Sequence, residues 1–88
     1  MTYEITAKFN YEYAGEKFQD DWDVNRGYFE AYYEAESFVD LVEMLLASLN
    51  DRLNKPSVVS TKENETVVIT GEIEDYDNVS IIFYTNLI

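Results

Sequence analysis

Residues 37–53 read SFVDLVEMLLASLNDRL, and this stretch decides the fold that we expect for the chain. Its apolar residues recur at intervals of three and four, which places them along one side of an α-helix. Ser37 and Asp40 form the pairing typical of a helix start, and Pro56 ends helical geometry before it. The sequence therefore predicts one amphipathic helix over residues 37–53. Its apolar stripe consists of Phe38, Leu41, Val42, Leu45, Leu46, Leu49 and Leu53.

Upstream of this helix, residues 3–13 alternate between aromatic or apolar side chains and polar ones. A period of two is typical of a strand with one buried face. Gly15 supplies a turn, and residues 17–24 then favour the return strand of a hairpin. We expect the polar side of the first strand to stay uncovered; its residues are Glu4, Thr6, Lys8, Asn10 and Glu12.

Residues 28–35 fit two structures. Phe29, Ala31, Tyr33 and Ala35 alternate with tyrosine and glutamate, which favours a third strand. A helix that continues into residues 37–53 is the alternative. The aromatic content makes the strand the preferred interpretation.

Downstream of Pro56 the period returns to two. Val58 and Val59 indicate a short strand that ends in a turn at residues 62–65. Residues 67–73 and 79–84 alternate as two further strands, and the polar run 75–78 joins them as a turn.

Together these segments predict an α+β fold in a single domain over residues 1–88. We expect an antiparallel sheet of five to six strands with one amphipathic helix packed on one face. The order is strand, strand, strand, helix, strand, strand, strand, and the short connections favour antiparallel pairing.

The composition excludes several kinds of chemistry. Cysteine and histidine are absent, so no thiolate metal site, cysteine nucleophile or Ser-His-Asp arrangement is possible. The three glycines are isolated and cannot form a phosphate-binding loop. The acidic runs 20–23 and 72–78 do not match the calcium loop of an EF-hand. We therefore expect neither an enzyme nor a cofactor or metal protein.

The beginning of the chain lacks a basic region followed by an apolar stretch, which predicts no signal peptide. The longest apolar run, Met44 to Ala47, is far too short to span a bilayer. We expect a cytoplasmic protein with no membrane partner.

The strongest functional signal is the charge. Asp and Glu number 18 against 6 Lys and Arg, which gives a net charge of −12. Such a field repels nucleic acid and attracts a cationic protein surface. Tyrosines lie among the carboxylates, and tyrosine is enriched at interfaces. The candidate partner-binding residues are Asp20, Asp21, Asp23, Glu30, Tyr32, Tyr33, Glu34, Glu36, Asp40 and Glu43.

In composition alone, the chain is similar to the small acidic inhibitors that phages and mobile elements make against nucleic-acid-binding proteins. This similarity is one of class, and no residue role is carried over from it. It implies a DNA-mimic type of inhibitor or regulator, in which carboxylates replace phosphates on the basic surface of a partner protein.

Two other interpretations stay open. A small core without disulfides and with β-rich ends also suits a structural or assembly protein that forms a homodimer through edge strands. A sensor of a small molecule or metal is the third class, and ligand would raise its melting temperature.

Overall fold

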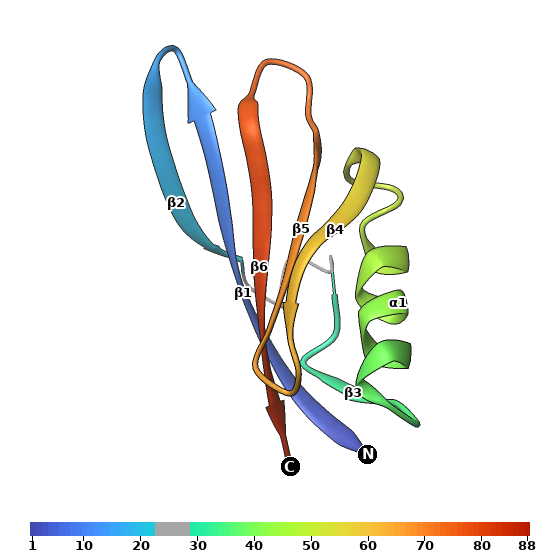
Figure 1. Cartoon of the computed structure of the whole chain (residues 1–88). Coiled ribbons are helices and arrows are strands. Elements are labelled where there is room, and N and C mark those ends of the chain that lie inside the picture. Colours follow the sequence, from blue (N-terminus) through green and yellow to red (C-terminus); the bar gives the residue numbers. More distant parts are fainter. Residues whose placement is uncertain (23–28) are drawn as a thin grey trace.

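The computed structural model describes residues 1–22 and 29–88 and confirms the α+β fold. A strongly twisted antiparallel sheet carries one helix on one face (Figure 1). The elements are β1 (Thr2–Tyr13), β2 (Glu16–Trp22), β3 (Tyr32–Glu34), α1 (Phe38–Ser48), β4 (Asn54–Lys62), β5 (Thr66–Glu72) and β6 (Asp77–Leu87).

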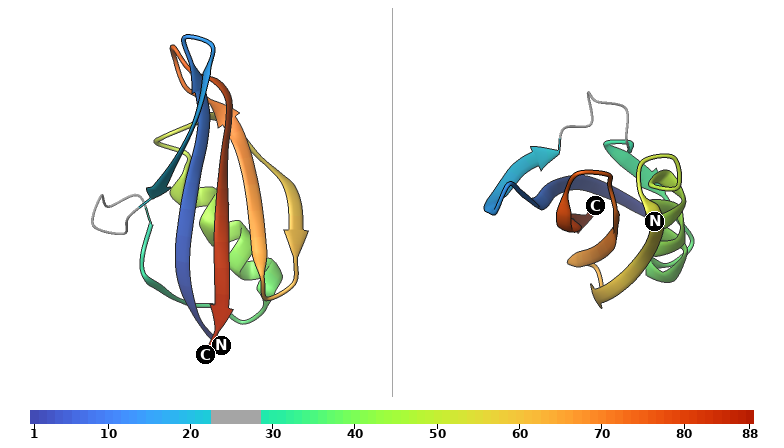
Figure 2. Two further views of the ribbon diagram at one scale, coloured as in Figure 1. Left: turned by 90° about the vertical axis from the view of Figure 1, so that its left-hand side faces the viewer. Right: turned by 90° about the horizontal axis from the view of Figure 1, so that it is seen from above.

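The strand order is β2-β1-β6-β5-β4, and every pairing is antiparallel. Strand β3 also pairs with β1, on the same edge as β2 but at the other end of the strand. Residues 2–4 of β1 face β3, and residues 7–13 face β2. Seen from above, the sheet curls, and α1 lies against its inner side (Figure 2).

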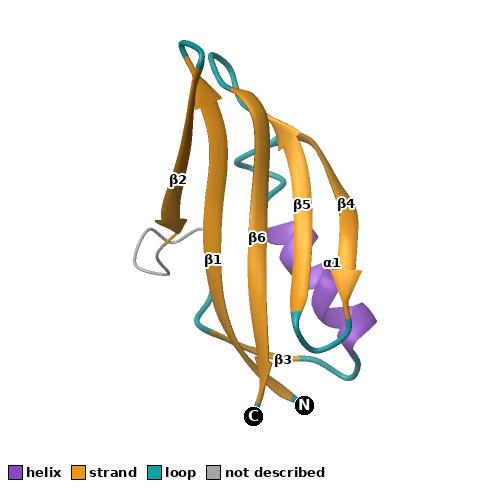
Figure 3. Cartoon of the chain, turned by 60° about the vertical axis from the view of Figure 1, so that its left-hand side comes forward, coloured by secondary structure: helices purple, strands orange, loops and turns teal. Residues whose placement is uncertain are grey.

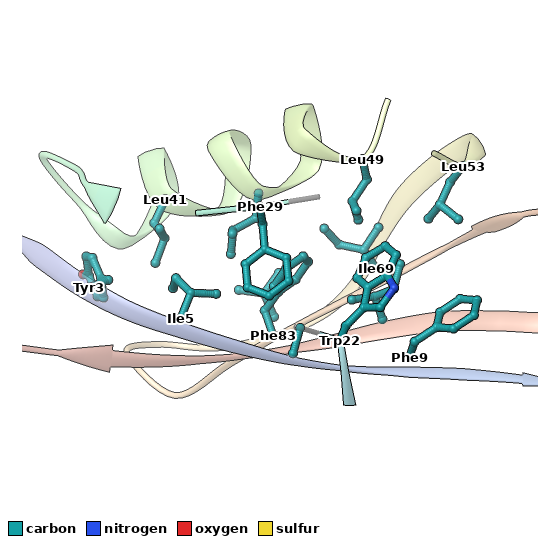
Figure 4. Packing of buried hydrophobic residues seen from close by; sticks show 14 of the residues in the cluster. Tyr3, Ile5, Phe9, Trp22, Phe29, Leu41, Leu49, Leu53, Ile69 and Phe83 are labelled. Carbon is teal, nitrogen blue, oxygen red and sulfur yellow. The ribbon is translucent and has the colours of Figure 1, made fainter. Parts of the chain in front are cut away.

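The core lies between this inner side and the helix (Figure 4). Side chains at alternate positions of β1, β5 and β6 point inward because the strand period is two. Tyr3 is fully buried, and its hydroxyl donates a hydrogen bond of 2.8 Å to Asn64 Oδ1 in the β4–β5 turn. The largest fully buried side chains are Tyr3, Phe83, Ile5, Leu41, Leu45, Leu49, Ile69, Ile81 and Val67.

Helix α1 is much shorter than the sheet that it covers. Its 11 residues rise about 16 Å, whereas the 12 residues of β1 extend about 40 Å. The longest dimension of the molecule is 41 Å, close to the length of β1. One end of the sheet, with the β1–β2 and β5–β6 turns, therefore projects beyond the helix (Figure 1).

The helix ends earlier than predicted, at Ser48 instead of residue 53. Leu49 is its C-cap, and the Ser48 hydroxyl donates to the Leu45 carbonyl at 2.6 Å. Turns continue the helical path of the backbone beyond Ser48, and in them the Leu53 N–H donates to the Leu49 carbonyl at 2.9 Å. The apolar stripe thus extends beyond the end of the helix, which is why periodicity alone overestimated the length of the helix.

The preferred interpretation of residues 28–35 is only partly right. Of this stretch, residues 32–34 form a strand and Phe29 is buried in the core, while residue 28 lies outside the described part. Strand β2 ends at Trp22, and the predicted continuation to residue 24 also lies outside it. Strands β4 and β6 are longer than predicted. Bulged pairing with β5 extends β4 to Asn54, and pairing with β1 extends β6 from Asp77 to Leu87.

The two ends of the chain lie side by side, in every view of the fold (Figures 1 to 3). The Ile88 N–H donates to the Thr2 carbonyl at 2.9 Å. The Met1 ammonium donates to the Ala35 carbonyl at 2.8 Å, just before α1. The first and last strands are therefore neighbours in the middle of the sheet.

Candidate partner-binding surface

Strand β3 sends its candidate residues to opposite faces of the sheet. Its register places Tyr32 opposite Glu4, Tyr33 opposite Tyr3, and Glu34 opposite Thr2. Because Tyr3 is buried, Tyr33 faces inward and packs against the core. Tyr32 is 55% exposed and lies on the outer face with Glu34. The two tyrosines do not form a common anchor.

Glu4 joins the outer group, although its position on β1 gave no reason to select it. The Tyr32 hydroxyl donates a hydrogen bond of 3.1 Å to Glu4 Oε2, and the Thr2 hydroxyl donates to Glu34. The hydrogen bond to the Glu4 carboxylate, and then its negative charge, raise the pKa of Tyr32 above the usual value for tyrosine. These contacts hold Glu4, Tyr32 and Glu34 in one arrangement.

Three other candidates lie around the beginning of α1. The Ser37 side chain accepts a hydrogen bond of 3.2 Å from the Asp40 backbone N–H, as expected for an N-cap. Glu36 and Glu43 are exposed, and Asp40 is half-buried. Glu30 is exposed before β3, and its backbone N–H donates to the Tyr33 hydroxyl at 3.1 Å. Residues 30–43 therefore form one acidic segment of strand and helix.

The candidates on β2 lie elsewhere. Asp20 faces inward and accepts a hydrogen bond of 3.1 Å from the Tyr11 hydroxyl. Asp21 faces outward, 3.8 Å from Lys8 Nζ, with its side chain 89% exposed. Asp23 lies outside the described residues. Neighbouring aspartates of one strand thus point to opposite faces.

The structure divides the candidates into two groups along β1. Glu34 lies opposite Thr2, and Asp21 lies opposite Lys8. Six residues of strand separate these positions, which is about 20 Å. We name the group on residues 30–43 together with Glu4 the β3–α1 surface.

The end of the sheet beyond the helix carries an aromatic cluster that the sequence analysis did not select. The rings of Tyr11 and Phe18 stack at 5.2 Å between centroids, and Tyr76 lies 4.7 Å from Tyr11 and 5.8 Å from Tyr13. A cavity of about 260 Å³ lies beside this cluster and is lined in part by Asp20 and Tyr76. The strands and turns that carry these rings are also rich in carboxylates; they are Glu12, Glu16, Glu74, Asp75 and Asp77.

The sequence does hold a signal for this cluster. Tyr11 and Tyr13 continue the inward row of β1, yet a helix over residues 37–53 rises only about 26 Å, whereas a strand over residues 3–13 extends about 36 Å. Comparing the two lengths would have shown that one end of the strand, with its inward side chains, projects beyond the helix.

Carboxylates dominate the surface of the described residues, and none of them is buried. Ion pairs between described side chains join Lys8 to Asp21 at 3.8 Å and Lys62 to Glu65 at 3.2 Å, all at exposed positions. The excess of negative charge therefore meets solvent. Within residues 1–22 and 29–88, no group of three or more acidic side chains is arranged to hold a metal ion.

Membrane-spanning helices are absent from the part of the chain that the structure describes, since none is both long and apolar enough. Comparisons with protein families, curated proteins and solved structures find no match to this chain.

Proposed function

We propose that this chain is an acidic binding protein of the DNA-mimic type, which occupies the basic nucleic-acid-binding surface of a partner protein. It acts in the cytoplasm as an inhibitor or regulator, in the manner of anti-defence proteins of phages, and it catalyses no reaction. The observation that supports this proposal is the set of mostly exposed carboxylates on the β3–α1 surface, where no lysine or arginine of the described residues forms an ion pair with them. Glu4 and Glu34 lie on strands, and Asp40 and Glu43 lie on the helix, so these four carboxylates need little further ordering on binding.

In this proposal Glu34, Glu36 and Glu43 pair with arginine or lysine side chains of the partner. Tyr32 adds an exposed aromatic ring beside them. The long-range field of the net charge of −12 accelerates the encounter, and the fixed carboxylates select the partner.

The test uses immobilised protein, a cell lysate and a salt gradient. We expect nucleic-acid-binding proteins to be retained, to elute as salt rises, and to lose nucleic acid when the free chain is added. The triple variant Glu30→Gln, Glu34→Gln and Glu36→Gln should lose this retention. A charge-matched control changes Glu63→Gln, Glu74→Gln and Asp75→Asn, which lie in the turns at the ends of β5.

Equal retention by both triple variants would place the contact outside the β3–α1 surface. Retention no better than that of an unrelated protein of equal charge would exclude the proposed function. The rival interpretation, a dimerising assembly protein, predicts that nucleic-acid-binding proteins are retained no better than by that control protein.

A further inference from the structure

Strand β2 is the least covered strand of the sheet. Every residue from Glu16 to Asp21 is exposed, whichever face its side chain occupies, and only Trp22 is buried. Among the described residues no strand pairs with its outer edge, and α1 lies toward β4 and β5 (Figure 3). A strand with an unpaired edge is a template for another strand.

The opposite edge of the sheet is built differently. Strand β4 contains Pro56, and Lys55 before it has a φ of 51°. Its pairing with β5 shifts register twice along nine residues. Proline, bulges and lysines are features that prevent an edge from accepting a further strand. In contrast, β2 pairs with β1 without any interruption from Glu16 to Trp22.

The hairpin determines which backbone groups of β2 point away from β1. Tyr13 and Glu16 flank a two-residue loop, and in such a hairpin these two residues exchange both backbone hydrogen bonds. Along the rest of the hairpin, hydrogen-bonded pairs alternate with pairs whose N–H and C=O groups point away from the partner strand. The same alternation directs the N–H of Ile5 to this edge, where it donates to the Ala31 carbonyl at 2.8 Å. The residues of β2 whose N–H and C=O point outward are Lys17, Gln19 and Asp21.

We infer that β2 pairs antiparallel with β2 of a second copy of this chain, about a two-fold axis that passes through Gln19. In this register Gln19 lies opposite Gln19 of the second copy, and Lys17 lies opposite Asp21 of the second copy. Symmetry repeats the Lys17–Asp21 pair on the other side of the axis. Every outward backbone group of β2 then meets an outward group of its partner strand.

Among the registers that pair only the described residues of β2, charge favours this one. A shift by two residues preserves the hydrogen-bond pattern but places Gln19 opposite Lys17 or Asp21, so that Lys17 and Asp21 no longer face each other. Within one chain, Asp21 already lies opposite Lys8, and Lys17 lies opposite Glu12. The proposed pairing therefore produces a row across four strands in which charges alternate: Lys8, Asp21, Lys17 of the second copy and Glu12 of the second copy.

The inner face of the same interface is aromatic. Phe18 is 37% exposed and stacks on Tyr11 in its own chain. Across the axis it lies diagonal to Phe18 of the second copy, within the reach of two aromatic side chains. The interface thus extends the aromatic cluster of each chain toward that of the other.

Sedimentation equilibrium of the purified chain tests this inference independently of any partner protein. Physiological salt is needed, because it screens the net repulsion between two acidic chains beyond about 8 Å. We expect a dimer whose dissociation constant rises at least about tenfold in Lys17→Asp and in Asp21→Lys, since each change sets like charges opposite each other. The double variant should dimerise better than either single one. Lys55→Asp on β4 carries the same charge change as Lys17→Asp and should have no effect.

A backbone variant gives a second readout that does not depend on charge. The Gln19 N–H points away from β1, so Gln19→Pro removes no hydrogen bond of the hairpin ladder but blocks the ladder between copies. We expect a folded monomer by circular dichroism and sedimentation. A chain that is monomeric at about 1 mM, or a dimer that persists in both Lys17→Asp and Gln19→Pro, would overturn the inference.

Discussion

At the scale of single residues, the contact between Tyr32 and Glu4 makes the outer face sensitive to pH. The protonated phenol donates to the carboxylate, whereas an ionised phenol would repel it. This raises the pKa of Tyr32, so the contact stabilises the fold below the usual pKa of tyrosine, near 10. The contribution is lost as pH rises through the raised pKa.

We predict that Glu4→Gln returns the pKa of Tyr32 toward its usual value, because a neutral amide replaces the carboxylate whose hydrogen bond and negative charge are the two largest causes of the raised pKa. Titration of the Tyr32 ring carbon by NMR measures this, and Tyr32→Phe assigns the signal. Glu12→Gln, farther along β1, is the matched control and should leave the titration unchanged. An unaltered midpoint in Glu4→Gln would show that the carboxylate does not hold the phenol in solution.

Thr85 offers a second test at this scale. Its side chain is 4% exposed, and its hydroxyl has no hydrogen-bond partner among the described residues. Burying an unpaired hydroxyl costs about 1–3 kcal/mol, so we predict that Thr85→Val raises the free energy of unfolding by about 1 kcal/mol. Urea denaturation measures the change. Thr70→Val, at a half-buried position of β5, should change stability less, and a loss in Thr85→Val would contradict the prediction.

At the scale of elements, the β1–β2 turn departs from what its conformation favours. Ala14 and Gly15 have φ values of 51° and 82°, which is the pattern of a type I′ turn. Glycine adopts this region freely, but alanine is strained there. The hairpin therefore forms with an unsuitable residue at its first turn position.

We predict that Ala14→Asn stabilises the chain by about 0.5–1 kcal/mol, because asparagine followed by glycine is the preferred pair in this turn. Ala14→Val should destabilise it, since a β-branched residue resists positive φ. Urea denaturation should show a shifted midpoint with an unchanged slope. A destabilised Ala14→Asn variant would mean that neighbouring contacts, not the backbone, control this turn.

Elements differ in how well the sequence predicts them. Hydrophobic periodicity shows which face of an element is buried. It did so for the alternating residues 3–13 and for the apolar stripe from Phe38 to Leu53. Neither pattern reports hydrogen bonding. The end of α1 at Ser48 and the start of β4 at Asn54, where Lys55 has positive φ, depend on backbone geometry that periodicity does not record.

At the scale of the whole molecule, strand pairing limited the prediction of the site. The candidates came from charge and from closeness in sequence, but β2 and β3 pair with different ends of the same edge of β1. This arrangement separates Asp21 from Glu34 and brings Glu4 to Tyr32 instead. Long-range pairing of this kind follows from the assembled sheet and is not readable in a single segment.

The neighbouring positions of β1 and β6 also affect how fast the chain folds. These strands are far apart in the chain, with Tyr3 opposite Leu87, yet they form the centre of the sheet. Their pairing requires closure of nearly the whole chain, which slows folding to the range of milliseconds to seconds, about that of other domains dominated by distant pairings. During synthesis β1 leaves the ribosome long before β6. Until β6 follows, β1 has only β2 and β3 beside it, and Ile5 and Phe9 lack their neighbours on β6; this is the interval in which a nascent chain depends most on chaperones.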